Sequence, residues 1–180
     1  MMTSAYSVTE LLELTNPNDL SALSDVLIDC VDGGASVSFL HPLSLDKARD
    51  FWLNVAKQIA SGERALIIAR DNAHRIVGTV QVILQQPENQ PHRGDISKLL
   101  VHRNARRNGL GAKLMAAAEI VARIAGKQVL VLDTATGGGA EKLYEQLGWQ
   151  LCGRIPDYAL WPSGGLCATT IYYKHINKSL

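Results

Sequence analysis

The chain has 180 residues, of which 47% are hydrophobic and 19% are charged, and its 18 basic and 17 acidic residues leave a net charge of +1. This composition excludes an intrinsically disordered protein, and the charge balance provides no large positive field for nucleic acid or an anionic membrane. The length suits one globular core, so we expect a single domain over residues 1–180.

Cysteine usage and the absence of apolar runs restrict the protein class further. Cys30, Cys152 and Cys167 are widely spaced, without the clustering that a disulfide framework or a zinc site needs, and the five histidines lack metal-ligand spacing. No stretch approaches the ~18 apolar residues of a membrane span, and the one basic run, HRNARR, has no interleaved aromatic residues. We therefore expect a cytoplasmic protein with no metal, no nucleic-acid partner and no membrane partner.

The first half of the chain predicts two helices followed by three strands. Apolar residues recur at helical spacing over residues 8–31 and again over 45–59, and glycines follow each run. Strand-forming runs lie at 64–69, 76–84 and 96–101, with turn residues between them. These three strands predict a meander.

The second half predicts an alternation of strands and helices. An alanine-rich amphipathic helix is expected over residues 109–126, followed by an apolar strand at 128–132 and a helix at 140–147. Two last strands are expected at 151–155 and 168–173. Because a strand, a helix and a second strand follow one another, parallel pairing with a right-handed crossover is predicted.

Residues 98–114, KLLVHRNARRNGLGAKL, run from a predicted strand through a basic turn into a predicted helix. The first turn of a helix has unpaired N–H groups and a partial positive charge, so it binds phosphate. Gly109 and Gly111 would let phosphate oxygens approach the backbone, and Arg106 and Arg107 add positive charge. Neither the Walker nor the Rossmann glycine pattern is present. We expect a pyrophosphate at this turn.

The segment RRNGLGA matches the (Q/R)xxGx(G/A) signature of the GNAT acetyltransferases, with Arg106, Gly109 and Gly111 in the specified places. Alone, the pattern also fits a capped helix after a basic loop, but here a strand, a turn and the helix AEKLYEQLGW follow it. The segments GGASVSF, RGDISKLLV, LDT, GRIPDYA and ATTIYYK make the chain resemble the tabtoxin-resistance acetyltransferase branch from about Gly33 to Lys174. The resemblance implies a mixed α/β fold, with a twisted sheet splayed between its fourth and fifth strands and flanked by helices.

The resemblance also implies a site for acetyl-coenzyme A (acetyl-CoA) in the gap of the splayed sheet. The pantetheine arm would pair with the backbone of the fourth strand at Leu99, Leu100 and Val101. The diphosphate would lie beside Arg106 and be surrounded by the backbone amides of Arg107, Asn108, Gly109, Leu110, Gly111 and Ala112.

Acetyl transfer to an amine needs a neutral nitrogen, a donor for the developing oxyanion and a proton for the departing thiolate. By resemblance, Tyr144 lies near the thioester sulfur and serves as the general acid; the alternative is a structural tyrosine on an amphipathic helix. A backbone amide near Leu100 or Val101 is the expected oxyanion donor, because a splayed strand leaves N–H groups unpaired.

Two carboxylates are candidates for taking the proton of the amine. Asp133 ends an apolar strand on the same face as Val129 and Val131, where partial burial would make it a stronger base. Asp95 opens the neighbouring strand, and both positions match acidic residues with base or amine-binding roles in the tabtoxin-resistance branch. That branch has the longer glutamate at the position of Asp95, so the aspartate would reach less far and could act through water. The alternative for each is a strand-end carboxylate bonded to backbone.

By resemblance, the acceptor is the primary amine of a small molecule, either an amino-acid-like or β-lactam toxin or an antibiotic, and the role would be antibiotic resistance or self-protection. Residues 36–39 and the loop 158–167 would form the pocket. One alternative is an acetyltransferase for protein or polyamine amines. A second is a non-catalytic sensor that binds acyl-CoA. The resemblance also suggests a homodimer.

Overall fold

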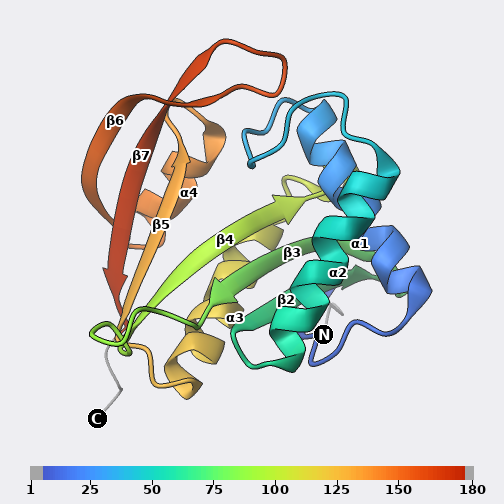
Figure 1. Ribbon diagram of the computed structural model, residues 1–180, viewed down its shortest axis with the longest axis horizontal. Helices are drawn as coiled ribbons and strands as arrows, with labels where there is room; N and C mark the ends of the chain where they lie inside the picture. The colour runs from blue at the N-terminus through green and yellow to red at the C-terminus, as the bar shows by residue number, and fades with distance from the viewer. Residues whose placement is uncertain (1–5, 177–180) are drawn as a thin grey trace.

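The computed structural model describes residues 6–176 as a mixed α/β fold, in which one seven-stranded sheet is flanked by four helices (Figure 1). A short 3-10 turn, η1, follows the fourth strand. The elements in chain order are β1 (Tyr6–Glu10), α1 (Pro17–Asp32), α2 (Leu45–Ala60), β2 (Arg64–Asp71), β3 (Ile76–Ile83), β4 (Arg93–Val101), η1 (Arg103–Ala105), α3 (Leu110–Ile124), β5 (Val129–Ala135), α4 (Gly139–Gln146), β6 (Gln150–Leu160) and β7 (Leu166–His175). The fold class is the one that the sequence predicts.

The sheet has the strand order β1-β2-β3-β4-β5-β7-β6 and opens in its middle. Helix α3 connects β4 to β5, and these two strands pair in parallel, as predicted. Their pairing joins only residues 93–95 with residues 129–131. Beyond Asp95, β4 has no strand partner on the β5 side among the described residues. This divergence confirms the predicted opening between the fourth and fifth strands.

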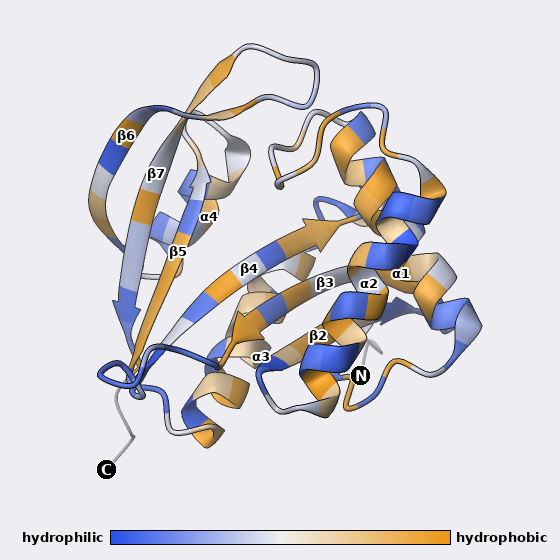
Figure 2. Cartoon of the chain, in the orientation of Figure 1, coloured by the Kyte–Doolittle hydropathy of each residue, from blue (hydrophilic) through white to orange (hydrophobic). Residues whose placement is uncertain are grey.

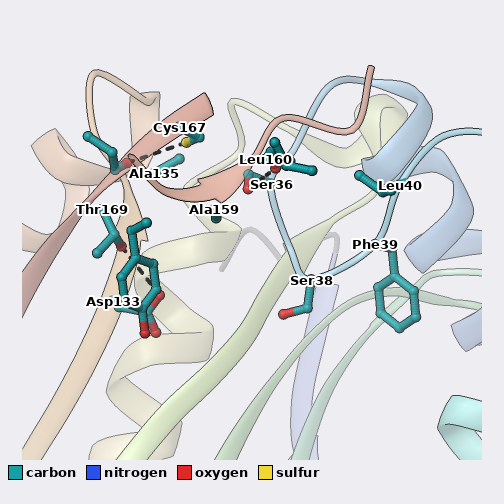
Figure 3. Close-up of a pocket in the computed structure, with 12 residues that line it drawn as sticks. Ser36, Ser38, Phe39, Leu40, Asp133, Ala135, Ala159, Leu160, Cys167 and Thr169 are labelled. Carbon is teal, nitrogen blue, oxygen red and sulfur yellow. Dashed lines mark hydrogen bonds between the residues drawn. The ribbon is translucent and has the colours of Figure 1, made fainter. Parts of the chain in front are cut away.

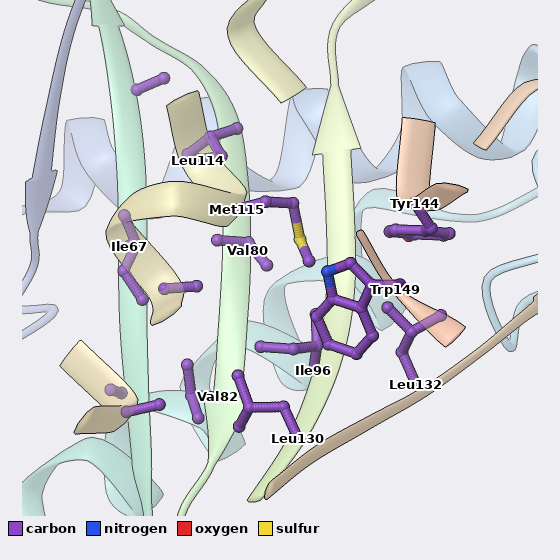
Figure 4. Close-up of a cluster of buried hydrophobic side chains, with 14 of the residues drawn as sticks. Ile67, Val80, Val82, Ile96, Leu114, Met115, Leu130, Leu132, Tyr144 and Trp149 are labelled. Atoms are coloured by element: carbon purple, nitrogen blue, oxygen red, sulfur yellow. The ribbon is translucent and has the colours of Figure 1, made fainter. Parts of the chain in front are cut away.

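Two apolar clusters hold the helices to the sheet. Helices α1 and α2 cover one face, where Leu27, Trp52 and Leu66 are buried together. Helix α3 covers the other face, where Leu114 packs in the same cluster as Ile67 (Figure 4). The neighbours Leu66 and Ile67 serve opposite clusters because successive side chains of a strand point to opposite faces. Figure 2 shows the resulting mixture of apolar and polar residues along the strands and helices.

The N-terminal segment differs from the sequence prediction. Helical spacing predicts one helix over residues 8–31, but Tyr6–Glu10 form the edge strand β1, with Val8 opposite Ala69 of β2. Helix α1 begins only at Pro17, after Asn16, whose side chain accepts a hydrogen bond from the Asn18 amide at 2.9 Å. The helix prediction was wrong here because pairing with a distant strand decides the conformation of this short edge segment.

The other predicted elements lie within a few residues of the observed ones, although β6 and β7 are longer than expected. They extend as a hairpin to the pair Leu160 and Leu166. Within residues 6–176, no helix is long and apolar enough to cross a membrane, and no group of three or more His, Cys, Asp or Glu side chains could hold a metal ion.

Candidate functional site

The turn between β4 and α3 presents a row of backbone donors. Arg107 has a φ of 65° and Gly109 a φ of 69°, and Gly109 caps α3 without any side-chain hydrogen bond. After the Arg106 amide, the next amide along the described backbone that donates to a carbonyl is that of Lys113, which bonds the Gly109 carbonyl at 3.2 Å. No acceptor among residues 6–176 bonds the amides of residues 107–112. Unpaired amides at a helix N-terminus favour an anion.

The signature residues of this turn have structural tasks of their own. The Arg106 Nε donates to the Val101 carbonyl at 2.9 Å, which ties the turn to the end of β4. A Cβ added at Gly111 would lie 3.0 Å from Leu143 Cδ2 on α4. The sequence interpretation assigned both glycines to phosphate approach. In the structure Gly111 also permits close packing of α3 against α4, while Gly109 provides the left-handed cap.

A buried carboxylate that the sequence analysis missed anchors the turn to α1. Asp29 accepts hydrogen bonds from the Arg103 amide at 2.8 Å and from Arg103 Nε at 2.7 Å. Burial raises the pKa of Asp29, but these two bonds and the charges of His102 and Arg103 outweigh it and hold the pKa below its usual value. Sequence spacing carries no signal for this contact, since the partners are 74 residues apart.

The open edge of β4 leads from this turn into the sheet. On the β3 side, Leu100 pairs with Thr79 and Val101 with Gly78. On the β5 side, residues 96–101 have no strand partner among the described residues. An unpaired strand edge can accept an extended chain of amides as an added strand. The predicted contacts at Leu99, Leu100 and Val101 lie on this edge.

A cavity of about 280 Å³ lies between the α1–α2 loop and the β5, β6 and β7 strands (Figure 3). The two segments expected to form the acceptor pocket both contribute to it, and Asp133 is the one carboxylate in its lining. The lining residues are Ser36, Ser38, Phe39, Leu40, Asp133, Ala135, Tyr158, Ala159, Leu160, Cys167, Ala168 and Thr169.

Two hydrogen bonds join the loop to the β6–β7 hairpin above the cavity. Ser36 Oγ donates to the Leu160 carbonyl at 3.2 Å, and the His41 amide donates to the Pro162 carbonyl at 2.8 Å. Loop and hairpin lie side by side at the top of Figure 1. The Ser36 and Leu160 pair also lines the cavity, so these bonds hold two parts of its rim together.

Asp133 lies on the wall of the cavity but is exposed. The Thr169 hydroxyl donates to Asp133 Oδ2 at 3.4 Å and to the Thr134 carbonyl at 3.0 Å. The sequence analysis expected partial burial beside Val129 and Val131, and this part of the expectation was wrong. The carboxylate lies in the diverging part of β5, where the β4 strand that would cover it has moved away.

Tyr144 lies on α4 and is only 5% exposed. Its ring centroid lies 6.1 Å from that of Trp149 and 5.9 Å from that of Tyr172, and Figure 4 shows Tyr144 near Trp149 in the apolar cluster. Burial, followed by the negative charge of Asp133, raises the pKa of the Tyr144 phenol far above its ordinary value. No hydrogen bond among the described residues uses this hydroxyl, so a neutral phenol is available as a proton donor.

Asp95 lies apart from the cavity lining, where β4 and β5 still pair. It is opposite Val131, and its two carboxylate oxygens accept hydrogen bonds from Arg93 Nη1 and, at 3.0 Å, from Gln86 Nε2. The structure thus gives the two candidate carboxylates different settings. Asp133 faces the cavity, and Asp95 is held by neighbouring side chains.

Solved structures of similar fold contain the same arrangement of elements. A protein assigned as an acetyltransferase from Salmonella typhimurium, solved with its cofactor acetyl-CoA, is 17% identical with a TM-score of 0.78, covering 97% of this chain and 95% of its own. A ribosomal-protein-alanine N-acetyltransferase from Brucella melitensis is 22% identical with a TM-score of 0.77, covering 94% and 99%. A protein assigned as a phosphinothricin N-acetyltransferase is 18% identical with a TM-score of 0.76, covering 96% and 100%. At these identities, the similarity establishes the fold.

The family follows from the sequence match itself. Residues 36–149, more than half of the chain, match the model of the acetyltransferase (GNAT) family. This range contains the free amides before α3, the open edge of β4, Asp133 and Tyr144. The chain therefore belongs to the GNAT family of acetyltransferases.

Proposed function

We propose that this protein transfers the acetyl group of acetyl-CoA to the primary amine of a small molecule. The observation that carries the proposal is the combination of three features: amides without an acceptor at the start of α3, a β4 edge without a strand partner on the β5 side, and a cavity with one carboxylate. Bound acetyl-CoA supplies the acetyl group as an activated thioester. The remaining steps depend on residues of this chain.

The free donors fit the cofactor. The amides of residues 107–112 would hold the diphosphate, beside the positive charges of Arg106 and Arg107. The backbone of residues 99–101 would pair with the amide-containing pantetheine arm. The presence of acetyl-CoA in the Salmonella structure of the same fold supports this assignment.

The proposed roles follow from the settings of the side chains. Asp133 would bind the amine and accept its proton, directly or through water. The Tyr144 hydroxyl would donate a proton to the thiolate sulfur. A backbone amide near Leu100 or Val101 would stabilise the negative charge on the carbonyl oxygen. Asp95 is the second candidate base. We rank it below Asp133 because its carboxylate is already bonded to Arg93 and Gln86.

The size and closure of the cavity favour a small acceptor. The cavity volume of about 280 Å³ lies just below the usual range for ligand sites, roughly 300–1,000 Å³. The bonds from Ser36 to Leu160 and from His41 to Pro162 bridge its walls, which hinders a protein terminus. The structure assigned as a phosphinothricin N-acetyltransferase supports a small amine, and an amino-acid-like or β-lactam toxin, with a role in antibiotic resistance, remains our first proposal. The alanine N-acetyltransferase of the same fold represents the protein-acceptor alternative.

The decisive experiment combines cofactor binding with a thiol-release assay. Calorimetry with acetyl-CoA tests the cofactor site, and a panel of amino acids, β-lactams, polyamines and alanine-terminal peptides tests the acceptor, with mass spectrometry of each product. Turnover on small amines supports the proposal. Turnover on peptides alone contradicts the acceptor class, and tight cofactor binding without turnover on any amine indicates an acyl-CoA sensor.

A further inference from the structure

Lys98 is an unusual residue beside the cavity. It lies in β4 where the pairing with β3 shifts register, and its φ is 51°. Its Nζ donates to Ser38 Oγ at 3.0 Å and lies 5.9 Å from the centroid of the Phe51 ring. Ser38 lines the cavity and also has a positive φ, of 76°. Ser38 on the cavity wall and the lysine that bonds it are thus both held on a strained backbone, a feature that clusters at ligand sites.

The ammonium group of Lys98 has no ion-pair partner among the described residues. Burial lowers the pKa of Lys98, the charge of Asp133 acts in the opposite direction, and the charge of Arg64 adds to the lowering. A buried charge is costly unless a counter-charge compensates it. Lys98 therefore lies in a setting that an anion would stabilise.

Neighbouring polar groups on the same face of the sheet reinforce this conclusion. Gln81 pairs with Leu66 of the α1–α2 cluster, so its side chain shares that face, and its Oε1 accepts a hydrogen bond from Arg64 Nη1. Gln81 Nε2 and Arg64 Nε are buried and have no hydrogen-bond partner among the described residues. Lys98 thus shares this face with a second cation, Arg64, and with two unsatisfied donors, Arg64 Nε and Gln81 Nε2.

We propose that Lys98 and Ser38 bind the acid group of an acceptor that carries both an amine and a carboxylate. Asp133 holds the amine at the opposite wall, and Figure 3 shows Ser38 and Asp133 on opposite sides of the cavity. This inference rests on the proposed acetyl transfer and narrows its substrate to amino acids and their analogues. Polyamines, which bring only positive charge to Lys98, are then poor acceptors.

The test compares acceptors that differ only in the acid group. Thiol release is measured for α-, β- and γ-amino acids, each against its own carboxamide, with wild type, Lys98→Met, Ser38→Ala and the control Lys57→Met, which removes an exposed lysine of α2. The wild type should prefer the best acid over its amide by about tenfold or more in kcat/KM, the size of one charge-assisted hydrogen bond. Lys98→Met should abolish this preference, Ser38→Ala should reduce it, and Lys57→Met should leave it unchanged.

Acetyl-CoA calorimetry and circular dichroism confirm that each variant is folded. A wild type that acetylates amines without preferring acids refutes the inference and leaves the proposed function intact. An acid preference that survives in folded Lys98→Met also refutes it. Absence of turnover on every amine refutes both this inference and the proposed function.

Discussion

Gly111 on α3 and Leu143 on α4 approach so closely that a β-carbon at Gly111 would lie 3.0 Å from Leu143 Cδ2. The glycine of the family signature thus brings the turn between β4 and α3 into contact with the helix that carries Tyr144. A side chain at this position would force the Leu143 methyl group to move. This glycine therefore allows the Leu143 contact in addition to its proposed role in anion binding.

Replacing Gly111 by alanine sets two effects against each other. Alanine favours the helix by about 0.5–1 kcal/mol, whereas overpacking costs about 1–3 kcal/mol. We expect Gly111→Ala to lower the free energy of unfolding by about 1 kcal/mol in wild type. In a Leu143→Ala background the contact is gone, so the same change should raise it by about 0.5 kcal/mol. Urea denaturation of wild type, the two single variants and the double variant gives the four free energies of unfolding of this double-mutant cycle. An equal effect of Gly111→Ala in both backgrounds would disprove the packing explanation.

Removing the Tyr144 hydroxyl should affect turnover and leave binding intact. We expect Tyr144→Phe to lower kcat by about 10²-fold, since general acid catalysis contributes that much or more. Acetyl-CoA affinity should stay within about twofold because the ring still packs on Trp149 and Tyr172. Because the pKa of Tyr144 is raised, tyrosinate absorbance of the two proteins should be the same up to about pH 10. Tyr173→Phe, which removes the hydroxyl of a β7 tyrosine with no proposed role, is the control. Equal kcat in wild type and Tyr144→Phe excludes the acid role.

The two carboxylates should differ in their effect on catalysis. We expect Asp133→Asn to lower kcat/KM for the amine by about 10²-fold or more, because the group that binds and deprotonates the acceptor is lost. Asp95→Asn should change it by less than about fivefold, because Asp95 bonds Arg93 and Gln86 outside the cavity lining. Steady-state kinetics with a fixed amine decide between them. A larger loss of kcat/KM in Asp95→Asn than in Asp133→Asn would identify Asp95 as the base.

The stability that Asp29 provides should depend on pH. Its pKa is lower in the folded protein than the ordinary 3.8, so its contribution is present above that value and is lost as pH falls through the lowered pKa. We expect Asp29→Asn to lower the Tm by a few degrees at neutral pH, and this difference should shrink below about pH 4. Asp25→Asn, an exposed position on the same helix, is the control. A difference that stays constant down to about pH 2 would show that the Asp29 charge contributes nothing.

Local patterns predicted most of the fold. The alanine-rich spacing of α3, the apolar run of β5 and the basic turn between β4 and α3 each specify their structure within one short window. The prediction failed at β1, because its strand conformation depends on pairing with β2. It also underestimated the length of β6 and β7, because their outer ends are strands only through pairing with each other, up to Leu160 and Leu166.

The sequence by itself determined the family signature, the order of the elements from α1 onward and the identity of Asp133, Asp95 and Tyr144 as candidates. Tertiary structure alone decided that Asp133 faces a cavity while Asp95 bonds its neighbours. It also decided that Asp29 supports the turn between β4 and α3, and that Lys98 meets Ser38, which lines the cavity. The physical reason is distance along the chain. A helix or turn is specified by hydrogen bonds and packing within a few residues, whereas burial, charge and access at the site arise between segments that only the folded sheet brings together.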